Sequence, residues 1–198
     1  MHMKRKVVLA FLLTGALVLS GCSKTNNSNE TSSGSTSTDS SAQGIDVSNM
    51  FSDRDKEIGY DEENSTVIKL SDDSTTCDSD AVQISGNTVT IIDEGTYILS
   101  GTLTDGMVIV DAEDTDKVQL VLDGVDITSA ESAAIYVREA DKVFITTASD
   151  SQNTLTNGGT YTAIDDNNID AAIFSKSDLT LNGAGFLTIT AKAGHGVV

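Results

Sequence analysis

Residues 116–124 read Asp-Lys-Val-Gln-Leu-Val-Leu-Asp-Gly, and they form the fullest copy of a segment that recurs along the chain. Apolar side chains occupy every second position in it, at Val118, Leu120 and Leu122. A period of two is typical of a β-strand that turns one face toward a core, and the Asp-Gly pair that follows is typical of a turn. We therefore expect a short strand here, with its alternate residues buried.

Similar strands precede and follow this copy at regular intervals. The central residues of the first strand in each copy are Val108, Ile135, Ile173 and Val197, which are 27, 38 and 24 residues apart. Without a polar insertion at residues 158–168, all three steps are near 25. That step is the length of one coil of a parallel β-helix, so we predict an all-β fold of this type. A β-sandwich or jelly roll remains an alternative, because short strands with Gly turns fit these folds as well.

Charged residues recur in step with the strands. Asp111, Arg138 and Lys176 each follow the first strand of their copy, so stacked coils would place an acid beside bases. The pairs Asp116-Lys117 and Asp141-Lys142 repeat in the same way. We interpret both sets as surface ladders, each of modest stabilising value.

The composition excludes several classes of function. Acidic residues outnumber basic ones 30 to 12, and the loss of Lys4, Arg5 and Lys6 with an N-terminal signal would change the net charge from −18 to −21. Such a charge repels nucleic acids and anionic lipid headgroups, so no nucleic-acid partner is expected. The chain has no Trp to form a sugar platform. Of its two His residues, His2 would be lost with the signal, so histidine chemistry would depend on His195 alone.

The N-terminus has the features of an export signal. Residues 1–6 are basic, residues 7–19 are apolar, and the sequence Leu-Ser-Gly-Cys ends at Cys22. This ending resembles a bacterial lipoprotein box, so we predict a signal peptide at residues 1–21 and lipidation at Cys22. An ordinary signal peptide is the alternative. Residues 22–42, rich in Ser, Thr and Asn, are predicted to be a disordered tether. The protein would then be exported and lipid-anchored to the cell membrane, facing outside, with the lipid as its only membrane contact.

The remaining chain divides into two regions. Residues 43–80 are predicted to be an N-terminal cap that covers the first coil with Met50, Phe51, Ile58 and Tyr60. Residues 81–198 are predicted to form the coils. These coils look incomplete at the C-terminus, because residues 196–198 read as the beginning of another strand. Cys77 is the only thiol of the body, so no internal disulfide is expected.

The insertion carries the densest group of oxygen ligands in the chain. Asp165, Asp166, Asn167, Asn168 and Asp170 lie within six residues, directly before a strand. Calcium takes six to eight oxygen ligands, which carboxylates and Asn carbonyls on a turn can supply. A solvated polar loop is the alternative. No Cys/His spacing supports zinc.

No motif of a catalytic nucleophile or of a phosphate-binding loop is present, so no catalytic residue is assigned. A β-elimination on acidic sugars would need a base near a calcium-bound carboxylate. Arg138, Lys142 and Lys176 are basic, but each is explained more simply as a ladder partner.

Three stretches resemble a bacterial family of exported carbohydrate-binding-domain proteins: residues 50–55 (Met-Phe-Ser-Asp-Arg-Asp), 118–127 (Val-Gln-Leu-Val-Leu-Asp-Gly-Val-Asp-Ile) and 171–176 (Ala-Ala-Ile-Phe-Ser-Lys). The resemblance implies a right-handed parallel β-helix, similar in shape to polysaccharide lyases, that binds calcium. It also implies a polygalacturonate-like acidic polysaccharide of plant cell walls, and cellulose, as partners. Carried to acidic positions here, calcium would bind chiefly at Asp165, Asp166 and Asp170 with Asn167, and Asp123 and Asp126 are secondary candidates.

Three hypotheses of function follow. The first is a monomeric surface lipoprotein that captures acidic polysaccharide through calcium, which would bridge the carboxylates of protein and polymer. The second is a calcium-dependent pectate-type polysaccharide lyase. The third is a structural or adhesion protein of the cell surface that presents a site for a partner.

Overall fold

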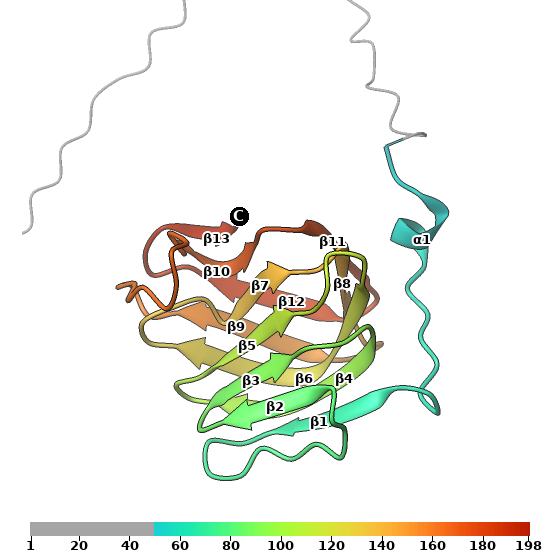
Figure 1. The fold of residues 1–198 in the computed structure, drawn as a ribbon, viewed down its shortest axis with the longest axis horizontal. Coiled ribbons are helices and arrows are strands. Elements are labelled where there is room, and N and C mark those ends of the chain that lie inside the picture. Colours follow the sequence, from blue (N-terminus) through green and yellow to red (C-terminus); the bar gives the residue numbers. More distant parts are fainter. Residues whose placement is uncertain (1–49) are drawn as a thin grey trace, which may run out of the picture. The chain divides into compact units, whose positions relative to one another are not determined.

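The computed structural model describes residues 50–198, which belong to one compact unit that spans Ile45–Val198. The predicted signal peptide, the lipidation site Cys22 and the predicted tether lie outside the described residues. Within residues 50–198, no helix is long and apolar enough to cross a membrane. Figure 1 shows the strands stacked one above another, from β1 at the bottom of the view to β13 at the top.

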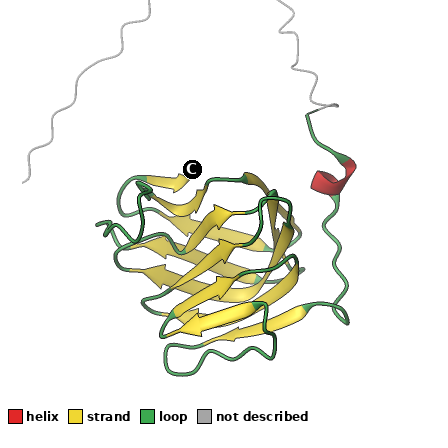
Figure 2. Ribbon diagram, in the orientation of Figure 1, coloured by secondary structure: helices red, strands yellow, loops and turns green. Residues whose placement is uncertain are grey.

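The described chain is almost entirely β-structure with loops between the strands, as Figure 2 shows. Its elements are α1 (Asp53–Lys56), β1 (Thr66–Leu70), β2 (Val82–Ser85), β3 (Thr88–Ile91), β4 (Gly95–Leu103), β5 (Met107–Asp111), β6 (Lys117–Ser129), β7 (Ile135–Glu139), β8 (Lys142–Thr147), β9 (Gln152–Asn157), β10 (Ala171–Ser175), β11 (Asp178–Gly183), β12 (Phe186–Thr190) and β13 (His195–Val197).

The strands form two sheets. Sheet A has the order β1-β4-β6-β8-β11, with β9 and β12 joined to it through the second half of β6. Sheet B has the order β13-β10-β7-β5-β3-β2. All strand pairs are parallel except β2 with β3. The all-β prediction is thus confirmed, whereas the antiparallel β-sandwich and jelly roll do not describe this pairing.

The register of sheet B agrees with the repeat found in the sequence. Val108 pairs with Ile135, Ile135 with Ile173, and Ile173 with Val197. The longer step between Ile135 and Ile173 contains the insertion, here residues 158–170, which leaves the sheet after β9 and returns at β10. Residues that pair across neighbouring strands point to the same face of the sheet. The inward-facing side chains of successive strands therefore form stacked rows.

The main core lies between the two sheets. Val118, Leu120 and Leu122 of β6 are fully buried in it, together with Val143 and Ile145 of β8. Fully burying one such side chain contributes roughly 1.5–3 kcal/mol. The predicted burial of alternate residues is therefore confirmed at Val118, Leu120 and Leu122.

The predicted charge ladders are present in part, and Lys176 forms no ion pair within residues 50–198. Arg138 donates from Nη1 to Oδ2 of Asp111 at 2.8 Å, and Lys117 forms an ion pair with Asp141. Lys142 differs from the prediction, because its partner is Asp55 of α1 at 2.6 Å rather than a residue of the next coil. The reason is that the segment with α1 folds onto the outer face of sheet A.

The region predicted to be the cap occupies two places. β1 pairs with β4 and continues sheet A at its edge. The segment around α1 instead contacts β6, β8 and β11 on the outer face of sheet A. Its apolar residues Met50, Phe51 and Ile58 are exposed rather than packed over an open end. Polar contacts, not apolar burial, decide where this segment lies.

The insertion covers the outer face of sheet B. Ile169 is buried there against Met107, Ile109 and Tyr136, and these residues form a second, smaller apolar cluster. Sheet B is therefore buried on both faces next to the insertion, which fits the continuous apolar run Met107-Val108-Ile109-Val110 in β5.

Candidate functional site

A pocket of about 560 Å³ lies where the insertion meets the ends of β7 and β10, and we call it the insertion pocket. Three carboxylates and two cations line it, so it combines hydrogen-bond acceptors with positive charges. The lining residues are Arg138, Glu139, Ala140, Asp165, Asp166, Asn167, Lys176 and Ser177.

One wall of the pocket is a hydrogen-bond network centred on Asp165. Its Oδ2 accepts from the hydroxyl of Tyr136 at 2.7 Å and from Nε of Arg138 at 3.1 Å. Its Oδ1 accepts from the backbone N–H of Asn167 at 2.8 Å and from Nδ2 of the same residue at 2.9 Å. Arg138 is thereby held between the carboxylates of Asp165 and Asp111. Such charge-assisted contacts fix the guanidinium in one orientation.

The protonation states of this network follow from its contacts. Burial tends to raise the pKa of Asp165, but hydrogen bonds from Tyr136, Asn167 and Arg138 outweigh it and lower the pKa to about 2. Burial, and then the bond to Asp165, raise the pKa of the Tyr136 phenol. At neutral pH the carboxylate is therefore ionised and the phenol remains a donor.

The network should lose its contribution to stability in acid. The pKa of Asp165 lies below its ordinary value of 3.8 in the folded state, so the stabilisation is present above about pH 4 and is lost as the pH falls toward 2. We expect Asp165→Asn to lower the urea midpoint at pH 6, and the difference from wild type to shrink near pH 2. Urea unfolding at both pH values measures this.

The matched control is Asp166→Asn, which removes an exposed carboxylate one residue away. Its midpoint should equal that of wild type at both pH values. An Asp165→Asn difference that stays constant between pH 6 and pH 2 would contradict the role given to the Asp165 carboxylate.

The structure separates the residues predicted to bind calcium. Asp165, Asp166 and Asn167 share the insertion pocket, whereas Asp123 and Asp126 are exposed on β6 in sheet A. Asp170 is half-buried at the end of the insertion, where its carbonyl oxygen accepts a hydrogen bond from the backbone of His195. Within residues 50–198, no group of three or more His, Cys, Asp or Glu side chains is arranged to hold a metal ion. Calcium at these positions stays a prediction.

The sequence alone did not reveal that Tyr136 belongs to this site. Tyr136 and Arg138 are two residues apart on β7, so both side chains lie on the outer face of sheet B, and the Arg138 guanidinium carbon is 5.4 Å from the centre of the Tyr136 ring. The alternation along β7 could have placed the two residues together. The contact of both with Asp165, 27 or more residues away, depends on how the insertion folds.

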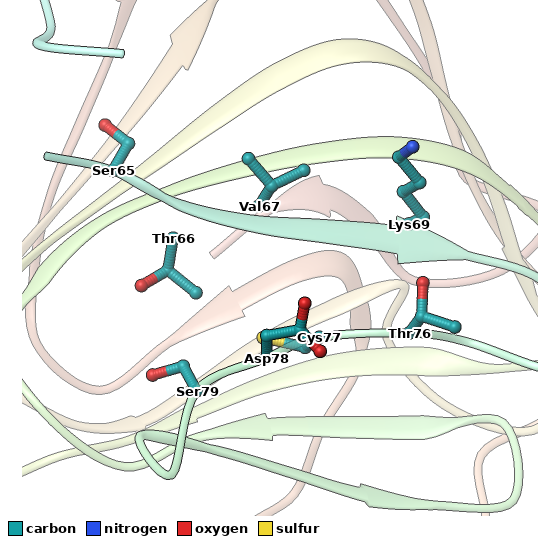
Figure 3. A pocket seen from close by; sticks show the side chains of 8 residues that line it. All are labelled: Ser65, Thr66, Val67, Lys69, Thr76, Cys77, Asp78 and Ser79. Atoms are coloured by element: carbon teal, nitrogen blue, oxygen red, sulfur yellow. The ribbon is translucent and has the colours of Figure 1, made fainter. Parts of the chain in front are cut away.

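A second pocket, of about 640 Å³, lies between β1 and the segment that follows it. Figure 3 shows Lys69 and Val67 on β1 and Asp78 on the opposite wall, with the sulfur of Cys77 behind it. We call it the β1 pocket; it has one cation and one carboxylate among its lining residues.

Comparisons with known proteins place the insertion pocket inside a shared region. A sequence model of the family described as "Carbohydrate-binding domain-containing protein" matches residues 85–198. A carbohydrate-binding domain-containing protein of Acetivibrio thermocellus is 38% identical over 133 residues, which cover 66% of this chain and 46% of that protein. The solved structure described as the polysaccharide lyase-like protein from C. thermocellum, gadolinium derivative, is 38% identical with a TM-score of 0.62, covering 67% of this chain and 54% of that one.

The chain thus spans about half the length of these relatives. All residues that line the insertion pocket lie within the matched segment, whereas the β1 pocket precedes it. The insertion pocket is for this reason the stronger candidate for a shared function.

Proposed function

Because this chain belongs to the family of carbohydrate-binding domain-containing proteins, we propose that it binds an acidic, polygalacturonate-like polysaccharide at the insertion pocket. The observation that carries the proposal is the pair of cations at the rim, Arg138 and Lys176. Arg138 is oriented by two carboxylates, while Lys176 is exposed and forms no ion pair within the described chain. Lys176 can therefore meet a sugar carboxylate, and the amide and hydroxyl groups of Asn167 and Ser177 can bond to sugar hydroxyls.

The charge of the protein limits how such a polymer can bind. The whole chain carries −18, and the lining carboxylates outnumber the lining cations, so an anionic polymer is repelled unless cations lie between the two. We therefore retain calcium as part of the proposal. Asp165 already accepts four hydrogen bonds, which leaves Asp166 and Glu139 as the lining carboxylates that can share an ion with the sugar. The polymer would supply the remaining oxygen ligands.

The proposal predicts a calcium-dependent affinity that Lys176 increases. We expect Lys176→Ala to weaken binding of oligogalacturonate about three- to tenfold, because one charge-assisted contact is lost. Isothermal titration of the full chain, with calcium and then with a chelator, measures both effects. Lys69→Ala, which removes the cation of the β1 pocket, is the control and should bind like wild type. Loss of binding in Lys69→Ala alone would move the site to the β1 pocket, and equal binding with and without calcium would remove the metal from the proposal.

Two finer features belong to the same proposal. The parallel register supports coils of a right-handed β-helix, which would present the pocket on one long side. The N-terminal sequence supports export and a lipid anchor at Cys22, outside the cell membrane. Labelling of the wild type but not of Cys22→Ala with a radioactive fatty acid tests the anchor.

A pectate-type lyase is the second candidate, favoured by the solved structure whose description reads "polysaccharide lyase-like". Arg138 is a poor base because guanidinium does not lose its proton in proteins, which leaves Lys176 as the basic group at the rim. Incubation of the protein with polygalacturonate and calcium tests this activity. Absorbance from unsaturated products would establish it, and a flat trace would leave a binding protein.

A further inference from the structure

Residues 52–60 lie across the outer face of sheet A, and we call this segment the strap. It begins at a capping box, in which the Ser52 hydroxyl accepts from the backbone N–H of Asp55 and the Asp55 carboxylate accepts from the backbone N–H of Ser52. The helix that follows has only four residues. A helix of this length is not stable by itself, so its contacts with the sheet hold it in place.

The strongest contact is made by the carboxylate of Asp55, which is buried in the sheet face. Its Oδ1 accepts from Nζ of Lys142 and from the hydroxyl of Thr180, each at 2.6 Å. The Lys142 ammonium, followed by the hydroxyl donors, holds the pKa of Asp55 well below its ordinary range. The face of sheet A thus contains a preformed carboxylate site, and the protein fills it with its own side chain.

The remaining contacts are also polar. Two amide side chains of the sheet donate to carbonyl oxygens of the strap: Nδ2 of Asn182 to Glu57 at 3.0 Å, and Nε2 of Gln119 to Gly59 at 3.4 Å. Gln119 and Asn182 are joined through Thr146, so they form one hydrogen-bonded row across β6, β8 and β11. Sugar hydroxyls also accept hydrogen bonds, so they could take the place of the strap's carbonyl oxygens as acceptors for these two amide side chains.

An aromatic ring completes the covered face. The guanidinium carbon of Arg54 lies 4.4 Å from the centre of the Phe144 ring, and Phe144 is only 1% exposed. A flat ring beside hydroxyl and amide groups is a surface on which a sugar ring can stack. The strap therefore occupies a carboxylate site, a row of hydroxyl-binding amides and an aromatic platform at once.

Little apolar burial opposes the release of the strap. Ile58 of the strap is 47% exposed, and Phe51 directly before the strap is 53% exposed, so the segment is attached mainly through groups that water or a ligand can satisfy. Pockets of about 370 and 530 Å³ border it on two sides, the first lined by Arg54 and the second by Ile58, Gly59 and Tyr60. A ligand can approach the strap from either pocket.

We propose that the strap is an autoinhibitory mimic of an acidic saccharide, covering a second binding site formed by Lys142, Thr180, Asn182, Gln119 and Phe144. Release of Asp55 leaves the Lys142 ammonium and the Thr180 hydroxyl for a sugar carboxylate. Recognition at this site uses a fixed cation and needs no calcium, in contrast to the insertion pocket. The sugar class rests on the proposed function, but the site, its ligands and its control by the strap do not.

The test opens the strap in the full chain with the double substitution Arg54→Ala and Asp55→Asn. We expect the variant to bind oligogalacturonate in the presence of a chelator at least about tenfold more tightly than wild type. In wild type only the molecules with an open strap can bind, so the apparent affinity is reduced in proportion to their fraction. Trypsin cleavage after Lys56 reports opening independently of binding. In wild type, saturating oligogalacturonate should accelerate this cleavage, since a ligand that binds the open state increases its population.

Two further substitutions separate this site from the insertion pocket. Lys142→Ala in the opened variant should abolish the gain, whereas Lys176→Ala in the same variant should leave it intact. The inference is overturned if the opened variant is cleaved after Lys56 without any gain, if the gain survives Lys142→Ala, or if the strap stays resistant to trypsin. Failure of calcium-dependent binding in wild type would count against the proposed function alone.

Discussion

Replacing Leu120 by alanine is expected to lower the free energy of unfolding by about 2–5 kcal/mol. Leu120 lies in the middle of β6, between Tyr97 of β4 and Ile145 of β8, and it is fully buried. The substitution removes apolar contacts and leaves a cavity between β4, β6 and β8 that the neighbouring side chains cannot fill. Urea unfolding, followed by the far-ultraviolet signal of the sheets, measures the change.

The effect should extend beyond one strand because each strand of the stack depends on its neighbours. β6 pairs with β4, β8 and β9, so a weakened β6 loosens both ends of the stack. Val67→Ala on β1 is the matched control: its side chain is 46% exposed, and the loss should be well under 1 kcal/mol. If Leu120→Ala were no worse than this control, the inward row of β6 would not be the centre of the core.

Replacing Gly158 by alanine should displace the insertion and weaken polysaccharide binding at least about tenfold. A Cβ atom at residue 158 would overlap the backbone carbonyl group of Ala130. Backbone cannot move aside as the end of a flexible side chain can, so the insertion has to shift where it leaves the sheet. A clash of this kind should also lower the free energy of unfolding by about 1–3 kcal/mol. Titration with oligogalacturonate and urea unfolding measure the two effects.

The matched control is Gly59→Ala in the strap. A Cβ atom there meets nothing within 4 Å, so stability and calcium-dependent binding should remain those of wild type. If Gly158→Ala bound oligogalacturonate as tightly as wild type, the polysaccharide site would have to lie away from the insertion.

The apolar core and the ion pair between neighbouring strands could be predicted, because they depend on the alternation within each strand and on the constant number of residues from one strand to its neighbour. Val108, Ile135, Ile173 and Val197 pair in the order expected from their spacing, and Arg138 meets Asp111. Parallel pairing turns equal spacing along the chain into adjacency in space. The apolar alternation therefore predicts where a strand lies, and the constant step predicts which strands pair with it.

The surroundings of the side chains on the outer face of sheet A could not be predicted in the same way. Gln119, Phe144 and Thr146 alternate with core residues, and this alternation by itself would turn them toward solvent, yet each is buried. The strap covers them through contacts between residues 60 or more positions apart, such as Arg54 with Gln119. No periodic signal marks a segment that is attached by polar side chains.

An all-β fold, the register of sheet B and the position of the insertion could be predicted from the sequence, because these follow from the period of the apolar residues and from the length of each step. The contacts of Asp165 with Arg138 and Tyr136, and of Asp55 with Lys142 on sheet A, became visible only in three dimensions. A carboxylate at a given position in the sequence can be hydrated, can pair with a cation or can accept a hydrogen bond from a distant residue. Which of these it meets depends on where the loops pack after the strands have paired.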